Sequence, residues 1–223
     1  IRDSFNTLRA LMSVAVQERL KLVTFDIKGA FMVSPIDDKD IYIELPKGYE
    51  APEGYTAKLS SSLYGCRDSA HRFWKTLSTW LIDYGFEVVN ADKTLFRLKK
   101  DDGTIMFITL YVDDWLTAHN NDAEYAKFIA ALASLFELSA ESTEITWYLG
   151  VCVERDWEQG TLKLTQQQYV TDLLERFQMS DCNPVLTPME VGQCLTSADC
   201  PNEVNKSNVK EYQQLVGSLN YLV

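Results

Sequence analysis

The stretch Ile105–His119, which reads IMFITLYVDDWLTAH, constrains the fold more than any other part of the sequence. Two runs rich in β-branched and aromatic residues flank the adjacent acids Asp113 and Asp114. Runs of that composition, separated by two residues that tolerate a turn, are typical of a β-hairpin. We therefore predict a hairpin that carries the two aspartates at its tip.

The two adjacent carboxylates are a candidate metal site. Held close together they repel each other, and their proton affinities rise unless a cation neutralises them. Hard cations such as Mg²⁺ bind carboxylate oxygens, so the pair could serve a divalent ion. The alternative is that Asp113 and Asp114 only form the turn and keep their side chains in water, and the dipeptide alone favours that alternative.

A third acid lies upstream in Leu22–Phe31, LVTFDIKGAF, a predicted apolar strand interrupted by Asp26. An acid in such a strand is costly to bury unless it is paired or binds a metal. If this strand lies beside the hairpin, Asp26 reaches the same point as Asp113, and converging carboxylates are what two-metal phosphoryl transfer requires. Taken singly, Asp26 fits a strand-end residue that faces water, whereas the three acids together favour the metal site.

Four segments follow one another along the chain: FDIKGAF, SLYGCRDSAHRFW, YVDD and WYLGV. In this order they resemble the reverse transcriptase of Ty1/copia-type retrotransposons, from about Leu8 to Leu222. The resemblance implies an α+β fold, the right-hand palm of a polymerase, in which an antiparallel sheet is backed by helices. It implies palm at residues 1–33 and 67–155, partial fingers at 34–66, and the base of a thumb or connection at 156–223.

The function that the resemblance implies is RNA-directed DNA polymerase, a nucleotidyltransferase that adds deoxynucleotides to a primer 3′-hydroxyl. Asp26 and Asp113 would hold two Mg²⁺ ions, for which Mn²⁺ can substitute, together with the backbone carbonyl of Ile27. Asp114 would be a secondary ligand or an electrostatic support. The expected partners are an RNA or DNA template with its primer, and deoxynucleoside triphosphates.

The resemblance also assigns residues to the incoming nucleotide. Phe31, beside Ala30, would be an aromatic gate beneath the sugar that clashes with a 2′-hydroxyl. Tyr64 and Gly65 would lie against the nucleotide, where glycine allows the backbone to approach closely. The alternative for Phe31 is an ordinary core aromatic, and both roles are compatible.

Further residues are assigned to the template and primer. Tyr111 and Val112 would hold the hairpin in the core with Val112 toward the primer end, and Leu149 and Gly150 match the primer grip. Arg67 would touch phosphate or template.

Each of these assignments has a structural alternative. Arg67 also fits a solvated position in the first turn of a helix, and WYLGV also fits an ordinary sheet strand. The chain departs from the family where Asp68-Ser69-Ala70 replaces the usual Gln-Ala-Pro, which affects template positioning more than chemistry.

The net charge of −11 is unusual for a nucleic-acid enzyme. Residues 1–119 carry 15 Lys and Arg against 17 Asp and Glu, and residues 120–223 carry 6 against 15. Because affinity for a phosphate backbone comes mainly from Lys and Arg, we expect weak template-primer binding. By resemblance, a basic segment before the first motif and the RNase H and integrase domains of a polyprotein are expected to be missing, which suggests a central fragment.

The remaining composition indicates an intracellular protein. No run reaches roughly 18 apolar residues, so no membrane span is predicted, and no secretory signal is apparent. The five cysteines form no CxxC pair, which favours reduced thiols. An active element would place the protein in a cytoplasmic virus-like particle. The sequence indicates no oligomeric state.

Two other functions stay open. The first is an inactive retrotransposon remnant that serves only as a folded binding or assembly module. The altered segment after Tyr64 and the acidic C-terminal half favour it, whereas the intact acids oppose it. The second is a two-metal nuclease, which lacks an obvious His or Lys to activate water and leaves Phe31 unexplained.

Periodicity and turn residues predict the secondary structure. Helices are expected at Ser4–Arg19 after an Asp3/Ser4 cap, Arg67–Tyr84, Asn121–Phe136, Gln166–Phe177 after a Thr165–Gln168 capping box, and Glu211–Leu222. Beside the hairpin and the Asp26 strand, strands are expected at Ile41–Leu45, Ala57–Leu59, Phe86–Asn90, Leu95–Leu98, Trp147–Glu154 and Gly160–Leu164. The stretch Asn183–Asn208 is expected to be a connector. Helices alternating with antiparallel strands indicate a sheet backed by helices on one face.

Overall fold

The computed structural model describes residues 5–36, 39–45, 47–50, 52, 54–111, 114–187, 189, 192–200 and 205–222. The chain divides into two compact units. The first comprises Ile1–Thr146 and Arg155–Leu162, and the second comprises Trp147–Glu154 and Lys163–Val223. Among the described residues, no helix combines the length and apolarity needed to cross a bilayer.

The first unit is built on an antiparallel sheet of six strands in the order β4-β5-β6-β7-β1-β8. The strands are β1 (Lys21–Ile27), β4 (Glu87–Val88), β5 (Leu95–Lys99), β6 (Ile105–Tyr111), β7 (Asp114–His119) and β8 (Leu138–Glu144). The predicted hairpin is confirmed as β6 and β7, and β1 is its neighbour in the sheet.

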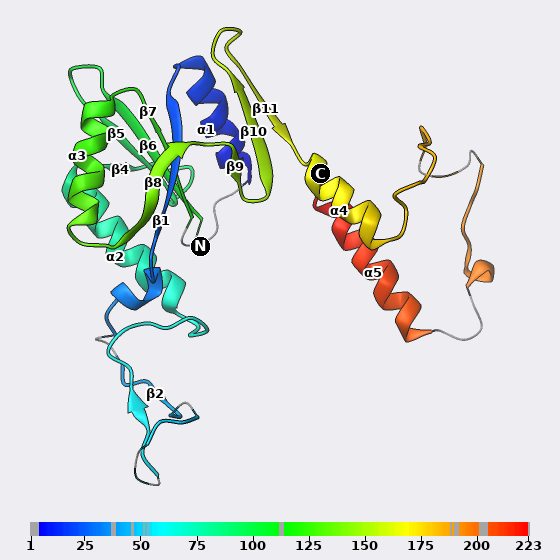
Figure 1. The fold of residues 1–223 in the computed structure, drawn as a ribbon, viewed down its shortest axis with the longest axis horizontal. Helices are drawn as coiled ribbons and strands as arrows, with labels where there is room; N and C mark the ends of the chain where they lie inside the picture. Colours follow the sequence, from blue (N-terminus) through cyan, green and yellow to red (C-terminus); the bar gives the residue numbers. More distant parts are fainter. Residues whose placement is uncertain are drawn as a thin grey trace. The chain divides into compact units, whose positions relative to one another are not determined.

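The main core lies between one face of this sheet and two helices, α2 (Ser69–Tyr84) and α3 (Asp122–Ala133) (Figure 1). Alternate residues of a strand point to the same face, so Phe25 and Ile27 of β1 and Trp115 of β7 enter this core. Helix α2 adds Phe73, Leu77 and Leu81 at spacings of four, and α3 adds Tyr125, Phe128 and Leu132. The predicted helices are confirmed, with α2 ending at the left-handed Gly85 as expected.

Helix α1 (Phe5–Gln17) contacts β1 and β7 but lies outside that core. Its buried residues Leu8, Leu11, Met12 and Ala15 repeat at three and four, which is one helical stripe. Leu22 and Leu116 are also buried, but they lie on the opposite face of the sheet from Phe25 and Trp115, because alternate residues of a strand point to opposite faces. Helices therefore cover both faces of the sheet, not one face only as predicted. The predicted cap, Asp3 and Ser4, lies outside the described residues.

The strand that carries Asp26 ends earlier than the predicted Leu22–Phe31. Strand β1 ends at Ile27, because Gly29 adopts a left-handed φ of 61° and the chain enters the 3-10 helix η1 (Ala30–Val33). Beyond it, β2 (Tyr42–Ile43) and β3 (Ala57–Lys58) form a small antiparallel pair.

The second unit contains β9 (Trp147–Tyr148) and most of β10 (Val151–Asp156), followed by α4 (Gln167–Arg176), the 3-10 turn η2 (Ser197–Asp199) and α5 (Lys206–Asn220). Strand β11 (Thr161–Thr165) completes a three-stranded sheet in the order β11-β10-β9. The predicted single strand Trp147–Glu154 is wrong, because the chain reverses at Leu149 and Gly150. Their φ values are 49° and 80°, so both residues are in the left-handed conformation that a two-residue hairpin turn requires.

The structure adds one strand that the sequence does not predict and corrects two predictions. Strand β8 was not predicted, because its sequence LSAESTE lacks an apolar alternation. The capping box is absent: α4 starts after Gln166, whose side chain makes no capping hydrogen bond, and Thr165 belongs to β11. Helix α5 begins at Lys206, earlier than predicted, because Asn205 caps it through the Ser207 amide.

Candidate functional site

Asp26 and Asp114 face each other across two neighbouring strands. The register of β1 and β7 pairs them directly, and the preceding pair is Phe25 with Trp115. Directly opposed residues of an antiparallel pair have Cα atoms about 4.5–5.5 Å apart and point to the same face. The two carboxylates, which lie 88 positions apart in sequence, therefore share one small area of the sheet.

This pair belongs to a row that crosses four strands. Tyr111 of β6 pairs with Asp114, and Asp26 pairs in turn with Ser139 of β8. Tyr111 is half-buried at the end of β6. Val112 and Asp113, which connect Tyr111 to Asp114 in the sequence, lie outside the described residues. The predicted convergence of Asp26 with Asp113 thus stays a prediction, and the geometry is reported for Asp114.

The alternation of β1 explains why Asp26 remains accessible. Its neighbours Phe25 and Ile27 enter the core, so Asp26 must point to the other face, where it is exposed. On that face Leu22 and Leu116 are buried, and α1 contacts both strands. Both acids are exposed at this end of the sheet.

A rigid aromatic layer supports the acids from below. Trp115 has no exposed surface, and its ring lies 4.8 Å from that of Phe25. Each of these rings is adjacent in sequence to one of the two carboxylates. Because buried aromatic pairs restrict the backbone on which they sit, the separation of Asp26 and Asp114 is held by the core.

The chemistry of this donor set fits a hard divalent cation, which prefers carboxylate oxygens. Within the part of the chain that the structure describes, no group of three or more His, Cys, Asp or Glu side chains forms a complete metal cluster. The third predicted acid, Asp113, is outside that part. Ile27, whose carbonyl was predicted as a ligand, is the last residue of β1 and buries its side chain in the core.

The predicted nucleotide-contacting residues form a second aromatic group near the end of β1. The ring of Phe31 lies 4.7 Å from that of Tyr64 and 6.3 Å from that of Phe73. Phe31 is 9% exposed and Tyr64 is 58% exposed, so one face of the cluster is core and the other is surface. Ala30 is fully buried, and Gly65 has a φ of 94°, which other residues rarely adopt.

The residues predicted to contact template and primer belong to different units of the chain. Arg67 is exposed in the turn before α2, in the first unit. Leu149 and Gly150 form the β9–β10 turn in the second unit.

Sequence reasoning missed Tyr221, whose hydroxyl donates a 2.9 Å hydrogen bond to the carbonyl oxygen of Leu149. Only the position of Gly150 could have hinted at it, since a Cβ there would lie 2.7 Å from the Tyr221 hydroxyl oxygen.

The comparison with protein families identifies the family of the domain that carries these residues. The family described as "Reverse transcriptase (RNA-dependent DNA polymerase)" matches residues 3–191, which include both aspartates and the hairpin. The chain belongs to this reverse transcriptase family.

Curated relatives of this reverse transcriptase domain are Ty1/copia-type retrotransposon polyproteins, as the four motifs predicted. The chain is 30% identical over 219 residues to the retrovirus-related Pol polyprotein from transposon RE2 of Arabidopsis thaliana, with 97% of the chain and 14% of the relative covered. It is 27% identical to that from transposon TNT 1-94 of Nicotiana tabacum, with 96% and 16% covered. It is 23% identical to the Ty1-JR2 Gag-Pol polyprotein of Saccharomyces cerevisiae, with 96% and 12% covered. The chain therefore spans only a small part of each polyprotein.

Proposed function

We propose that this chain is the catalytic core of an RNA-directed DNA polymerase, which adds a deoxynucleotide to the 3′-hydroxyl of a primer paired with an RNA or DNA template. The observation that carries the proposal is the register that sets Asp26 opposite Asp114 in a domain of the reverse transcriptase family. Exposed carboxylates on adjacent strands suit chemistry on an extended polymer, which a closed cavity would exclude.

The parts of a polymerase hand can be assigned to the chain on this basis. Residues 1–33 and 67–155 would form the palm, which includes the six-stranded sheet and its acids. Residues 34–66, with the short β2–β3 pair, would form partial fingers, and residues 156–223 the base of the thumb or a connection. The sheet and the positions of the motifs within it support this assignment.

Asp26, Asp113 and Asp114, with the Ile27 carbonyl, would hold two Mg²⁺ ions or Mn²⁺ in their place. When bound, such ions lower the pKa of the primer hydroxyl and neutralise charge on the triphosphate and departing pyrophosphate. The residues themselves contribute position. Since placement and charge neutralisation supply most of the rate in phosphoryl transfer, a shift of one carboxylate should be severe.

Phe31 and Tyr64 would select and orient the nucleotide. Phe31 contacts both Tyr64 and Phe73 and is itself a core residue, so a large movement of its ring away from a 2′-hydroxyl would disturb its packing against Phe73. That rigidity allows one side chain to be both a core aromatic and a gate. Ala30 and Gly65 add no bulk where the sugar and base would approach.

The primer and template would be held by backbone and by cations. The β9–β10 turn presents the peptide groups of Leu149 and Gly150. Tyr221, directly after α5, would act as a positioning residue that restrains this turn. Val112 would face the primer end beside Tyr111. Arg67, exposed before α2, would contact a template phosphate.

The test is primer extension on an RNA template with Mg²⁺. We expect Asp26→Asn and Asp113→Asn each to lower the rate by at least about 10²-fold, because each removes charge at the reacting centre. Asp83→Asn is the matched control, since Asp83 is exposed on α2 and lies outside the proposed machinery. Circular dichroism should show all three folded. Full extension by folded Asp113→Asn would refute the assignment.

A binding measurement separates an inactive remnant from an enzyme. Trp115 is buried and adjacent to Asp114, so its fluorescence should change on titration with Mg²⁺ or Mn²⁺, and Asp26→Asn should weaken that change. A folded chain that binds metal without extending a primer would support the remnant. A labelled primer that became shorter would support the nuclease.

A further inference from the structure

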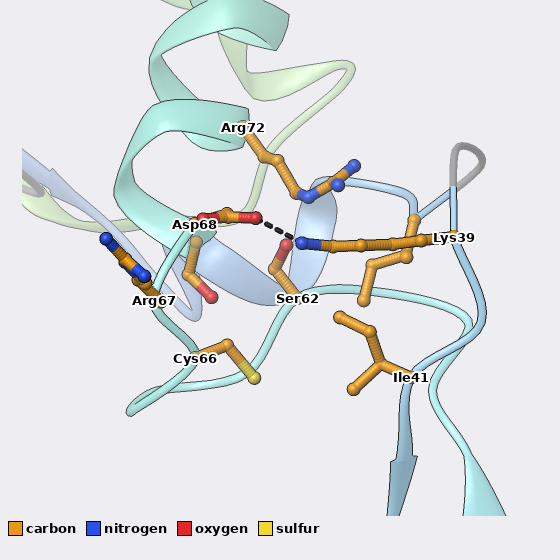
Figure 2. A pocket seen from close by; sticks show the side chains of 9 residues that line it. Lys39, Ile41, Ser62, Cys66, Arg67, Asp68 and Arg72 are labelled. Carbon is orange, nitrogen blue, oxygen red and sulfur yellow. Dashed lines mark hydrogen bonds and ion pairs between the residues drawn. The ribbon is translucent and has the colours of Figure 1, made fainter.

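A cavity of about 470 Å³ lies in the first unit, before and at the start of α2. Neither Asp26 nor Asp114 is among the residues that line it. The lining residues come from the segment after η1 and from the stretch that runs into the first turn of α2: Ile36, Lys39, Ile41, Ser62, Cys66, Arg67, Asp68, Ser69 and Arg72. Segments about 30 residues apart in sequence therefore build one hollow, shown in Figure 2.

Positive charge dominates this lining. Its described charged side chains are three cations, Lys39, Arg67 and Arg72, against the single acid Asp68. Lys39 reaches across the cavity and forms an ion pair with Asp68, while Arg72 extends above that pair and Arg67 points to the other side (Figure 2). Hydrogen bonding and attraction from Lys39 lower the pKa of Asp68, so the acid is ionised at neutral pH.

Ser62 provides an independent sign of a ligand. It lines the cavity and is 1% exposed, and its hydroxyl oxygen has no hydrogen-bond partner among the residues that the structure describes. Leaving a buried hydroxyl unsatisfied costs about 1–3 kcal/mol, so such a group needs an explanation. Figure 2 shows Ser62 among the side chains that line the cavity together with Lys39 and Asp68.

The start of α2 points to the same chemistry. Asp68 occupies the N-cap position, yet its side chain makes no capping hydrogen bond and binds Lys39 instead. The first turn of a 16-residue helix carries partial positive charge and amide donors, which favour anions. Asp68 thus behaves as an anion bound by Lys39 and not as a cap.

We propose that this cavity binds a phosphate group, and that Asp68 is an internal anion that occupies Lys39 until the phosphate displaces it. Lys39 and Arg72 would pair with the phosphate oxygens, and the Ser62 hydroxyl would donate to one of them. The phosphate chemistry is shared by a polynucleotide backbone and a free polyphosphate, and the assignment to a polymerase substrate rests on the proposed function.

The experiment measures binding without catalysis, in EDTA, with two probes: a labelled single-stranded oligodeoxythymidine and inorganic tripolyphosphate. We expect Asp68→Asn to tighten binding of at least one probe about tenfold at low salt, the effect of freeing one charge-assisted hydrogen bond. For the oligonucleotide, the slope of log affinity against log salt should steepen by about 0.7, the value for one more phosphate contact on a single strand. Asp83→Asn, which removes the same charge from the other end of α2, should change neither.

Two further variants separate binding from folding. Ser62→Ala should weaken phosphate binding several-fold while leaving the unfolding midpoint unchanged or higher, because the hydroxyl it removes has no partner in the described protein. In the Lys39→Gln background, Asp68→Asn should lose its effect, since the cation it frees is gone. A gain with only one probe identifies the source of the phosphate.

The proposal is overturned if Asp68→Asn and Asp83→Asn behave alike with both probes, or if Ser62→Ala binds as tightly as the wild type. The proposed polymerase function fails separately. A protein that shows this binding pattern but never extends a primer retains the phosphate site and loses only the polymerase assignment.

Discussion

The turn between β9 and β10 is predicted to depend on Tyr221 of the segment after α5. The Tyr221 hydroxyl donates to the Leu149 carbonyl at 2.9 Å, its ring lies 4.9 Å from that of Tyr169, and its own carbonyl accepts a bond from the Gln166 side chain. Tyr221→Phe removes only the first of these. We expect a loss of about 0.5–1.5 kcal/mol in local stability, toward the lower end because Tyr221 is 43% exposed.

Gly150→Ala tests the same contact from the other side. A Cβ at Gly150 would lie 2.7 Å from the Tyr221 hydroxyl oxygen, and the φ of 80° adds a left-handed cost of about 1–2 kcal/mol for a residue with a side chain. In the single variant the tyrosine must also move and give up its hydrogen bond. In Tyr221→Phe that oxygen is absent, and the next ring atom lies at 3.8 Å, an ordinary contact. The double variant should therefore be about 0.5–1.5 kcal/mol more stable than the sum of the two single effects.

The assay is hydrogen exchange by mass spectrometry on the peptide that spans residues 147–154. Tyr221→Phe should speed exchange at the amides of the turn, whereas Tyr212→Phe, which alters an exposed tyrosine of α5, should not. If the turn is the primer grip, Tyr221→Phe should also raise the KM for primer more than it lowers kcat. Strictly additive effects in the cycle, or unchanged exchange in Tyr221→Phe, would refute the reasoning.

Two further predictions concern the stability of the first unit. Arg155→Leu should lower the free energy of unfolding by about 2–4 kcal/mol in urea titrations. The guanidinium of Arg155 donates hydrogen bonds to the carbonyls of Leu20 and Ala15 at 2.5 and 2.9 Å and stacks on Trp157. An unchanged urea midpoint would contradict this role. Burial lowers the pKa of His119, against a smaller opposing effect of Asp122, so the unfolded chain takes up a proton first. The free energy of unfolding should then fall as pH drops below about 6.5, by at most about 1.4 kcal/mol per pH unit, until pH reaches the folded-state pKa of His119. His119→Gln should flatten this dependence. An identical pH profile in the variant would exclude His119 as its source.

Local patterns were enough to predict the elements that bury a regular stripe. The apolar repeats of α1, α2 and α3 and the β-rich runs around Asp113 and Asp114 carry their own signal, because burial on one side imposes a period. Strand β8 carries no such period, since its existence depends on pairing with β1. The prediction of one strand at Trp147–Glu154 is wrong for a related reason. Two left-handed residues divide it into two strands, and in the sequence only Gly150 indicates that turn.

The sequence by itself determined the family, through four motifs in order, and it named the acids that the proposed chemistry would use. It could not show that Asp26 lies opposite Asp114, because that register is set by strands 88 positions apart and by the Phe25–Trp115 contact beneath them. It also could not show that Lys39 binds Asp68 beside the buried hydroxyl of Ser62, or that Tyr221 reaches Leu149. These contacts join segments distant along the chain. Tertiary packing decides them, since no local propensity acts over such separations.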